Sequence, residues 1–175
     1  MVSQIFLLKP IQNRVFSMKV LFVCLGNICR SPAAEGVFRK MISDHNLNHL
    51  IEHDSCGTGG WHEGEPPDGR MIEHAKERGY DLSDLVARQI RPEKDFNNFD
   101  LILTMDESNA INVRRLTKDP IHLKKIKAFT SYCKIHDVSE VPDPYYKDEI
   151  GFELVLDILE DGCEQLVLEM KEKLS

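Results

Sequence analysis

The sequence predicts an α/β fold, a three-layer sandwich in which a four-stranded parallel sheet is flanked by helices. Apolar runs without polar alternation, at 19–23 and 100–105, are typical of buried parallel strands. Segments with helical spacing alternate with these runs, which favours right-handed crossovers that place helices on the sheet faces. The chain has 175 residues, a length that suits a single domain.

The first half of the chain contains two strands and one helix in alternation. After the strand at 19–23, a helix is expected over 31–45, because Ser and Pro are good residues for a helix start. A second strand is expected at 52–55. The segment 57–67 is rich in Gly and Pro and lacks periodicity, so we expect an exposed loop.

The second half continues this alternation up to a long terminal helix. The expected elements are a helix over 68–78 that stops at Gly79, a strand at 100–105, a helix from the capping residue Asp106 to about Leu116, a strand at 126–129, a polar loop over 139–147 and a helix whose apolar face runs from Phe152 to Met170. Gly162 interrupts this last helix. It either bends the helix or permits close packing.

Residues 18–175 are expected to form the domain, because Met18 directly precedes the first strand. Residues 1–17 are then an N-terminal extension, either native or produced by an upstream start. The apolar run at 5–8 is too short for a secretory signal and is ended by a Lys-Pro pair.

Composition excludes several classes of partner. The net charge of −7 argues against nucleic acid, which requires clustered Lys and Arg. No apolar run approaches membrane-spanning length, so no membrane partner is expected. An odd number of cysteines without a secretory signal indicates reduced thiols and a cytoplasmic location. These are Cys24, Cys29, Cys56, Cys133 and Cys163.

The segment 24–32 carries the clearest chemistry. It joins the first strand to a helix start, where free backbone N–H groups and the helix dipole form an anion site. That field favours the thiolate of Cys24, and Arg30 offers a two-pronged donor to a tetrahedral oxyanion. The sequence therefore predicts a phosphate loop with a thiolate that attacks phosphorus. Its amides come from Leu25, Gly26, Asn27, Ile28, Cys29 and Arg30.

No metal or other cofactor is expected. A zinc site is disfavoured because Cys24 and Cys29 lack a matching second pair of ligands. His45, His49 and His53 follow at intervals of four, but their segment passes from helix to strand. We expect these histidines at the surface.

The run Val-Cys-Leu-Gly-Asn-Ile-Cys-Arg-Ser-Pro at 23–32 resembles the signature of the low-molecular-weight protein tyrosine phosphatases. The resemblance extends from Met18 to the C-terminus. Its further motifs are Asp54-Ser55, Trp61, Ala87-Arg88-Gln89-Ile90, Met105-Asp106-Glu107-Ser108-Asn109 and Asp143-Pro144-Tyr145-Tyr146.

The resemblance implies hydrolysis of phosphotyrosine in proteins through a covalent phosphocysteine. It implies that Cys24 is the nucleophile and that Arg30 stabilises the transferring oxygens. Asp143 would protonate the leaving group and later take a proton from water. Phosphotyrosine-containing proteins are the implied partners.

The resemblance also implies supporting roles in and around the loop. Asn27, Ser31 and Ser55 would hold the loop in shape through hydrogen bonds. Many members carry His two residues before the Ala-Arg pair, where this chain has Leu85, so the completion of the Asn27 network is open.

Three aromatic residues are expected at the pocket, and a second cysteine is expected to have a redox role. Trp61, Tyr145 and Tyr146 would wall the pocket and stack against an aromatic substrate. Cys29 would form a reversible disulfide with Cys24, which protects the nucleophile.

Three other functions compete with phosphotyrosine hydrolysis. Arsenate reduction uses a similar loop with extra cysteines, but the downstream cysteines are widely spaced here. Relatives that hydrolyse phosphoarginine tend to carry Thr where this chain has Ile28, an apolar wall suited to a phenyl ring. A catalytically silent phosphoprotein-binding module would not need the set Cys24, Arg30 and Asp143.

Overall fold

The computed structural model describes residues 17–145 and 149–174. Its centre is a parallel sheet of four strands in the order β2-β1-β3-β4. The strands are β1 (Met18–Cys24), β2 (Ile51–Gly57), β3 (Leu101–Thr104) and β4 (Ile126–Ala128). The predicted α/β class and four-stranded parallel sheet are confirmed.

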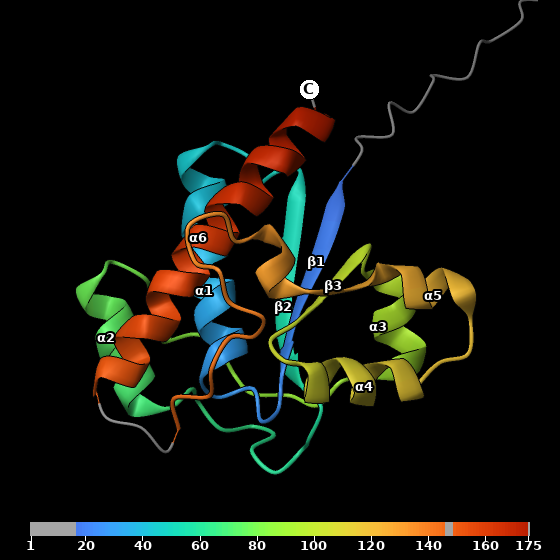
Figure 1. Ribbon diagram of the computed structural model, residues 1–175, viewed down its shortest axis with the longest axis horizontal. Helices are drawn as coiled ribbons and strands as arrows, with labels where there is room; N and C mark the ends of the chain where they lie inside the picture. The colour runs from blue at the N-terminus through green and yellow to red at the C-terminus, as the bar shows by residue number, and fades with distance from the viewer. Residues whose placement is uncertain (1–16, 146–148, 175) are drawn as a thin grey trace, which may run out of the picture.

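Helices cover both faces of the sheet (Figure 1). On one side lie α1 (Arg30–Asp44), α2 (Gly69–Glu77) and α6 (Glu149–Leu174). On the other side lie α3 (Pro92–Asn98), α4 (Glu107–Arg115) and α5 (Pro120–Lys125). A short 3-10 helix, η1 (Phe129–Tyr132), follows β4.

The first strand is apolar from Val20 to Val23 because both of its faces are covered there. Val20 and Phe22 belong to the core shared with α1 and α6. Leu21 and Val23 point to the opposite face and belong to the core formed with α3 and α4. Successive residues of a strand alternate between faces, so burial on both sides selects an unbroken apolar run.

Two helices, α3 and α5, are absent from the prediction. The sequence predicts that the helix from Asp106 ends near Leu116, and it predicts no element at Asp119 and Pro120. In the structure they start α5: the Asp119 carboxylate accepts a hydrogen bond from the Ile121 amide, and Pro120 occupies the first helical turn.

Gly162 permits close packing within a continuous α6. A methyl group at Gly162 would lie 2.5 Å from a ring carbon of Phe129. Because Gly162 has no side chain, α6 can contact η1 closely at this position. Of the two expectations for this residue, close packing is the one that the structure supports.

Of the predicted N-terminal extension, residues 1–16 lie outside the described residues, so the boundary at Met18 stays a prediction. Among the helices that the structure describes, none combines the length and apolar character needed to cross a membrane.

Candidate active site

The predicted phosphate loop lies at the carboxyl end of β1, the edge where parallel sheets bind ligands. The segment that directly follows β2 holds one side of the phosphate loop by hydrogen bonds. The amides of Thr58 and Gly59 donate hydrogen bonds, each of 2.9 Å, to the carbonyls of Cys24 and Leu25. Gly57 makes this approach possible, because a Cβ there would lie 2.7 Å from the Leu25 carbonyl oxygen.

The loop is also anchored from the start of α2. The Asp68 amide donates a hydrogen bond of 2.7 Å to the Ile28 carbonyl. Between these anchors Asn27 has a φ of 56°, in the left-handed region that few residues other than Gly adopt. The carbonyls of Cys24, Leu25 and Ile28 are thus all bound by segments outside the loop.

The sulfur of Cys24 accepts a hydrogen bond from the Asn27 amide at 3.3 Å. Ser31 Oγ lies 3.0 Å from the same sulfur. The Cys24 side chain is buried and yet lines a pocket. Donors that converge on sulfur stabilise a thiolate relative to a thiol.

The Asn27 side chain connects the predicted support residues. Its Nδ2 donates to Ser31 Oγ and to Ser55 Oγ, both at 2.9 Å. Its Oδ1 accepts from the Arg88 amide at 2.9 Å. Arg88, which was not predicted at the site, therefore completes the Asn27 amide contacts. Leu85 packs against the core on the α1 and α6 side.

Arg30 is almost fully buried at the start of α1. Its Nη1 lies 2.6 Å from Asp106 Oδ2, and its Nη2 lies 2.9 Å from Asp143 Oδ2. Burial opposes the charge, but Cys24, Asp106 and Asp143 raise the pKa of the guanidinium above its ordinary value. The structure thus brings the predicted Arg30 and Asp143 together.

Asp106 has a role that the sequence analysis missed. It was predicted only as a helix cap, and its Oδ1 does accept from the Asn109 amide at 2.7 Å. Its Oδ2 simultaneously holds Arg30. The signal was available, because the motif at 105–109 was among those that carry the resemblance.

A pocket of about 250 Å³ opens over the loop. Trp61 is 73% exposed and lines it, as does Tyr145. Tyr146 lies outside the described residues. His62 also lines the pocket, and its Nδ1 lies 2.6 Å from Glu65 Oε2. His62 was not predicted, although it directly follows Trp61.

Arg70 is a second unpredicted residue beside the pocket. Its guanidinium lies over the Tyr145 ring, 5.5 Å from the centroid, and donates to the Tyr145 carbonyl at 3.2 Å. The Tyr145 amide in turn donates to Asp143 Oδ1 at 3.1 Å. Arg70 thereby links α2 to the loop that carries Asp143.

All five cysteines are free thiols. Burial, with Asp68 and Cys24 adding to it, raises the pKa of Cys29 far above its usual range. Burial also raises the pKa of Cys56 and Cys163, and it raises the pKa of Cys133 to about 11.

The surface prediction for His53 is wrong. Its side chain is only 18% exposed, and Nδ1 lies 3.1 Å from Oε1 of the buried Glu35. His45 and His49 are exposed as expected. The sequence could not identify this contact because Glu35 belongs to the preceding helix.

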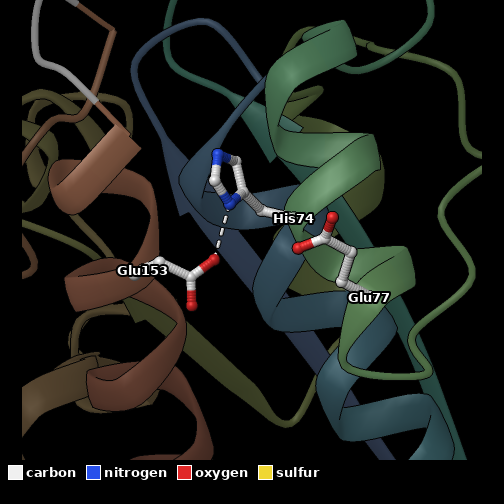
Figure 2. A group of neighbouring side chains, drawn as sticks. All are labelled: His74, Glu77 and Glu153. Atoms are coloured by element: carbon white, nitrogen blue, oxygen red, sulfur yellow. Dashed lines mark hydrogen bonds and ion pairs between the residues drawn. The ribbon is translucent and has the colours of Figure 1, made fainter.

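Three side chains between α2 and α6 are close enough to share a cation: His74, Glu77 and Glu153 (Figure 2). The Glu153 carboxylate already has two partners. His74 Nδ1 lies 2.5 Å from Oε1, and the Arg78 guanidinium holds Oε2. The Arg78 charge opposes a metal ion at this carboxylate, and the group is best described as a link between two helices.

Fold and site together define a class: a three-layer α/β protein whose first strand ends in a buried cysteine, followed by a loop and by a helix that begins at a buried arginine. The family model of the low molecular weight phosphotyrosine protein phosphatases matches residues 19–175. The chain belongs to this family.

Known relatives agree in sequence and structure. The human low molecular weight phosphotyrosine protein phosphatase is 45% identical over 139 residues, which are 78% of this chain and 85% of the human one. A crystal structure of a protein tyrosine phosphatase from Entamoeba histolytica, with Hepes in its active site, has a TM-score of 0.86 at 45% identity, covering 90% and 99% of the chains. An arginine phosphatase from Drosophila has a TM-score of 0.80 at 31% identity, covering 88% and 98%.

Proposed function

We propose that this chain hydrolyses phosphotyrosine in proteins through a phosphocysteine formed on Cys24. Family membership supports the reaction class. The observation that carries the residue assignment is the placement of the Cys24 sulfur: it accepts a hydrogen bond from the Asn27 amide, lies 3.0 Å from Ser31 Oγ and shares one pocket with Arg30 and Asp143. Such a pocket offers a nucleophile, an oxyanion site and an acid together.

In the first step, the Cys24 thiolate attacks phosphorus and forms an S–P bond while the bond from phosphorus to the tyrosine oxygen breaks. The loop amides and Arg30 bind the three non-bridging oxygens. The negative charge of a bound phosphate dianion would attract the Arg30 guanidinium away from Asp143. The Asp143 carboxyl group would then face the leaving oxygen. Protonated Asp143 gives its proton to that oxygen, and tyrosine leaves neutral.

In the second step, water attacks the phosphocysteine. Asp143, now a carboxylate, takes a proton from the water as its oxygen bonds to phosphorus. The S–P bond breaks, inorganic phosphate leaves and the Cys24 thiolate is restored. No redox change or metal is needed for this sequence to balance.

The pocket walls support an aromatic substrate. Ile28, Trp61 and Tyr145 provide apolar and aromatic surface beside the loop, and Trp61 is freely exposed for contact. Tyrosine-phosphorylated proteins are therefore the proposed partners.

Phosphoarginine hydrolysis is the second candidate, because the Drosophila arginine phosphatase shares the fold. The apolar Ile28 argues against it. The test compares turnover of phosphotyrosine and phosphoarginine peptides without added metal, with Cys24→Ser as the blank. Faster turnover of phosphotyrosine, lost in the blank, supports the proposal. Preference for phosphoarginine would overturn the substrate assignment, and absence of Cys24-dependent turnover would overturn the mechanism.

Arsenate reduction and silent binding receive less support. A reductase relay needs a reactive third thiol, whereas burial raises the pKa of Cys56 and Cys163 and keeps them protonated. A binding module would have no use for an acid beside the pocket.

We also propose redox protection of the nucleophile. Peroxide would convert the Cys24 thiolate to a sulfenic acid, and Cys29 would displace water from it to form a disulfide. The raised pKa of Cys29 makes this closure slow at neutral pH. Mass spectrometry of peroxide-treated protein should find a Cys24–Cys29 crosslink. Its absence would remove the redox role and leave Cys29 as a packing residue.

A cytoplasmic location is proposed on the chemistry of the thiols. The nucleophile works only when reduced, and all five cysteines are free. Localisation of the tagged full chain in its native cell tests this, and recovery from an oxidising compartment would contradict it.

A further inference from the structure

A chain of side-chain hydrogen bonds leaves the phosphate loop on the side away from the pocket. From Ser31 it passes through Asn27 to Ser55, with both contacts at 2.9 Å. Ser55 Oγ then donates to Oε2 of Glu35 at 2.6 Å, and His53 Nδ1 lies 3.1 Å from Oε1 of the same carboxylate. This series of hydrogen bonds therefore ends at the carboxylate–histidine pair of Glu35 and His53, which no part of the proposed reaction uses.

The Glu35 carboxylate determines which group donates and which accepts in each hydrogen bond of this series. The Ser55 hydroxyl donates its one hydrogen to Glu35 Oε2, so the hydroxyl has no hydrogen left for Asn27. Ser55 Oγ is then free to accept from the Asn27 amide nitrogen. Asn27 cannot turn around, because its Oδ1 accepts from the Arg88 amide.

The same logic reaches the nucleophile. Asn27 Nδ2 donates to Ser31 Oγ, so that oxygen acts as an acceptor and its own hydrogen is left to point elsewhere. Cys24 Sγ, at 3.0 Å, lies closer than the Cys56 carbonyl, at 3.3 Å. A hydroxyl hydrogen aimed at sulfur stabilises the thiolate.

Glu35 needs a second donor because its carboxylate is only 8% exposed. A buried carboxylate with one partner carries a large desolvation cost, which further hydrogen bonds offset. His53 supplies the second donor, and since a carboxylate only accepts, Nδ1 carries the hydrogen. The His53 ring is itself held edge-on to Phe38, with centroids 6.3 Å apart.

This histidine comes from β2 and not from the segment before the Ala-Arg pair. In that segment the chain has the apolar Leu85, which packs against the core on the α1 and α6 side. His53 lies on β2, two residues before Ser55, so both side chains are on the same face of the strand. One face of β2 thus supplies both the serine and the histidine that contact Glu35.

We propose that Glu35 and His53 are positioning residues for Cys24, which act through Ser55, Asn27 and Ser31 to aim the Ser31 hydroxyl at the nucleophile. This proposal rests on the proposed role of Cys24. Without His53, the Glu35 carboxylate loses a donor and can turn, and Ser55 is no longer fixed.

The test replaces His53 and measures Cys24 directly. The variants are His53→Leu, which keeps bulk against Phe38 but has no donor, and His53→Asn, whose amide nitrogen lies near the position of Nδ1. The exposed His49, changed in the same two ways, is the matched control. Each variant is measured for iodoacetate alkylation of Cys24 at neutral pH, for kcat and KM on p-nitrophenyl phosphate, and for Tm.

His53→Leu should lower both the alkylation rate and kcat by about three- to tenfold with little change in KM, the size expected for one lost hydrogen bond. His53→Asn should restore most of both, and the His49 variants should match the parent. In a Ser55→Ala background, His53→Leu should have no further effect on alkylation, because the connection is already broken.

A lower Tm with parental alkylation and kcat would overturn the proposal and leave His53 a structural residue. An unchanged effect of His53→Leu in the Ser55→Ala background would also overturn it. If His53→Leu does not fold, His53→Val, which suits a strand, carries the same test. Alkylation requires no turnover, so failure of the proposed phosphatase activity would be seen separately.

Discussion

Arg30 joins three separate parts of the chain through one buried side chain. Its guanidinium contacts Asp106 at the start of α4 and Asp143 in the loop before α6, while its backbone begins α1. A planar fork can satisfy two carboxylates and then a phosphate, which a single ammonium group cannot do. In the proposed reaction, this residue would therefore determine how tightly the transferring oxygens are bound.

Arg30→Lys should lower kcat/KM by roughly 10²–10³, the usual cost of removing a transition-state donor. Steady-state kinetics on p-nitrophenyl phosphate measure this loss. Arg39→Lys is the matched control, because Arg39 also makes a two-pronged contact, with Asp84, but at the surface. Equal losses in both variants would show that Arg30 acts through stability alone.

At the scale of elements, helix starts position the site. Asp106 caps α4 and holds Arg30 with its other oxygen. Asp119 caps α5 in the same way, at the Ile121 amide, but among the described residues its side chain contacts Ile121 and His122 and no predicted site residue. A comparison of the two residues therefore separates the contribution of capping to stability from the contribution of Asp106 to the site.

Asp119→Ala should destabilise the fold by about 1 kcal/mol, the typical cost of a lost cap. Asp106→Ala should destabilise it by more, because the buried Arg30 guanidinium also loses one of its two carboxylate partners. Only Asp106→Ala should also lower kcat, because Arg30 loses its partner. Chemical denaturation and steady-state kinetics on the same preparations measure the two effects. Unchanged kcat in Asp106→Ala would contradict the proposed positioning of Arg30.

Gly162→Ala should destabilise the chain by about 1–3 kcal/mol, because the new methyl group collides with Phe129. Helix propensity alone predicts the opposite sign. Gly69→Ala is the control, since a methyl group there meets no described atom within 4 Å, and it should be neutral or stabilising. Thermal unfolding of both variants decides between packing and propensity.

The sequence predicted the long elements better than the short ones. The apolar run of β1 and the spacing in α6 extend over enough residues to reveal their period. By contrast, α3 and α5 have seven and six residues, less than two helical turns. The helix α4 already ends at Arg115, whereas Asp119 and Pro120 begin α5. An Asp-Pro pair is a helix-start pattern, but the segment after it is too short to show a helical period.

For the site, local motifs were predictable and distant partners were not. Asn27 in the loop and Ser31 in the first turn of α1 are four residues apart, and the resemblance already implied that both support the loop. Asp106 is separated from Arg30 by 76 residues, and Glu35 reaches His53 only because α1 packs on β2. Such pairings depend on strand order, which periodicity does not specify.

At the scale of the whole molecule, buried carboxylates connect stability to pH. Asp161 of α6 accepts hydrogen bonds from the amides of Lys134, Ile135 and His136. Burial acts in the other direction, but these backbone donors lower the pKa of Asp161 below its ordinary value. The unfolded chain therefore takes up a proton at higher pH than the folded chain does.

A lowered folded-state pKa contributes stability that is complete above the unfolded value, near 4, and is lost as pH falls through the folded value. The free energy of unfolding should decrease as pH falls below about 4. Asp161→Asn should flatten part of this decrease and lower stability at pH 7, whereas the exposed Asp137→Asn should do neither. Urea unfolding at a series of pH values measures it, and identical slopes in all three proteins would contradict the assignment.

The central claim is that a phosphoryl group passes through the sulfur of Cys24. The most direct measurement is rapid denaturing quench of the Asp143→Asn variant during turnover of p-nitrophenyl phosphate, followed by peptide mass spectrometry. The p-nitrophenolate leaving group needs little protonation, so the phosphocysteine still forms in this variant. Hydrolysis of the phosphocysteine is slowed, because the Asp143 carboxylate that takes a proton from water is missing. We expect phosphate on Cys24 of the Asp143→Asn variant. The double variant, which carries Cys24→Ser together with Asp143→Asn, should carry none. Turnover with phosphate on another residue, or on none, would contradict the central claim.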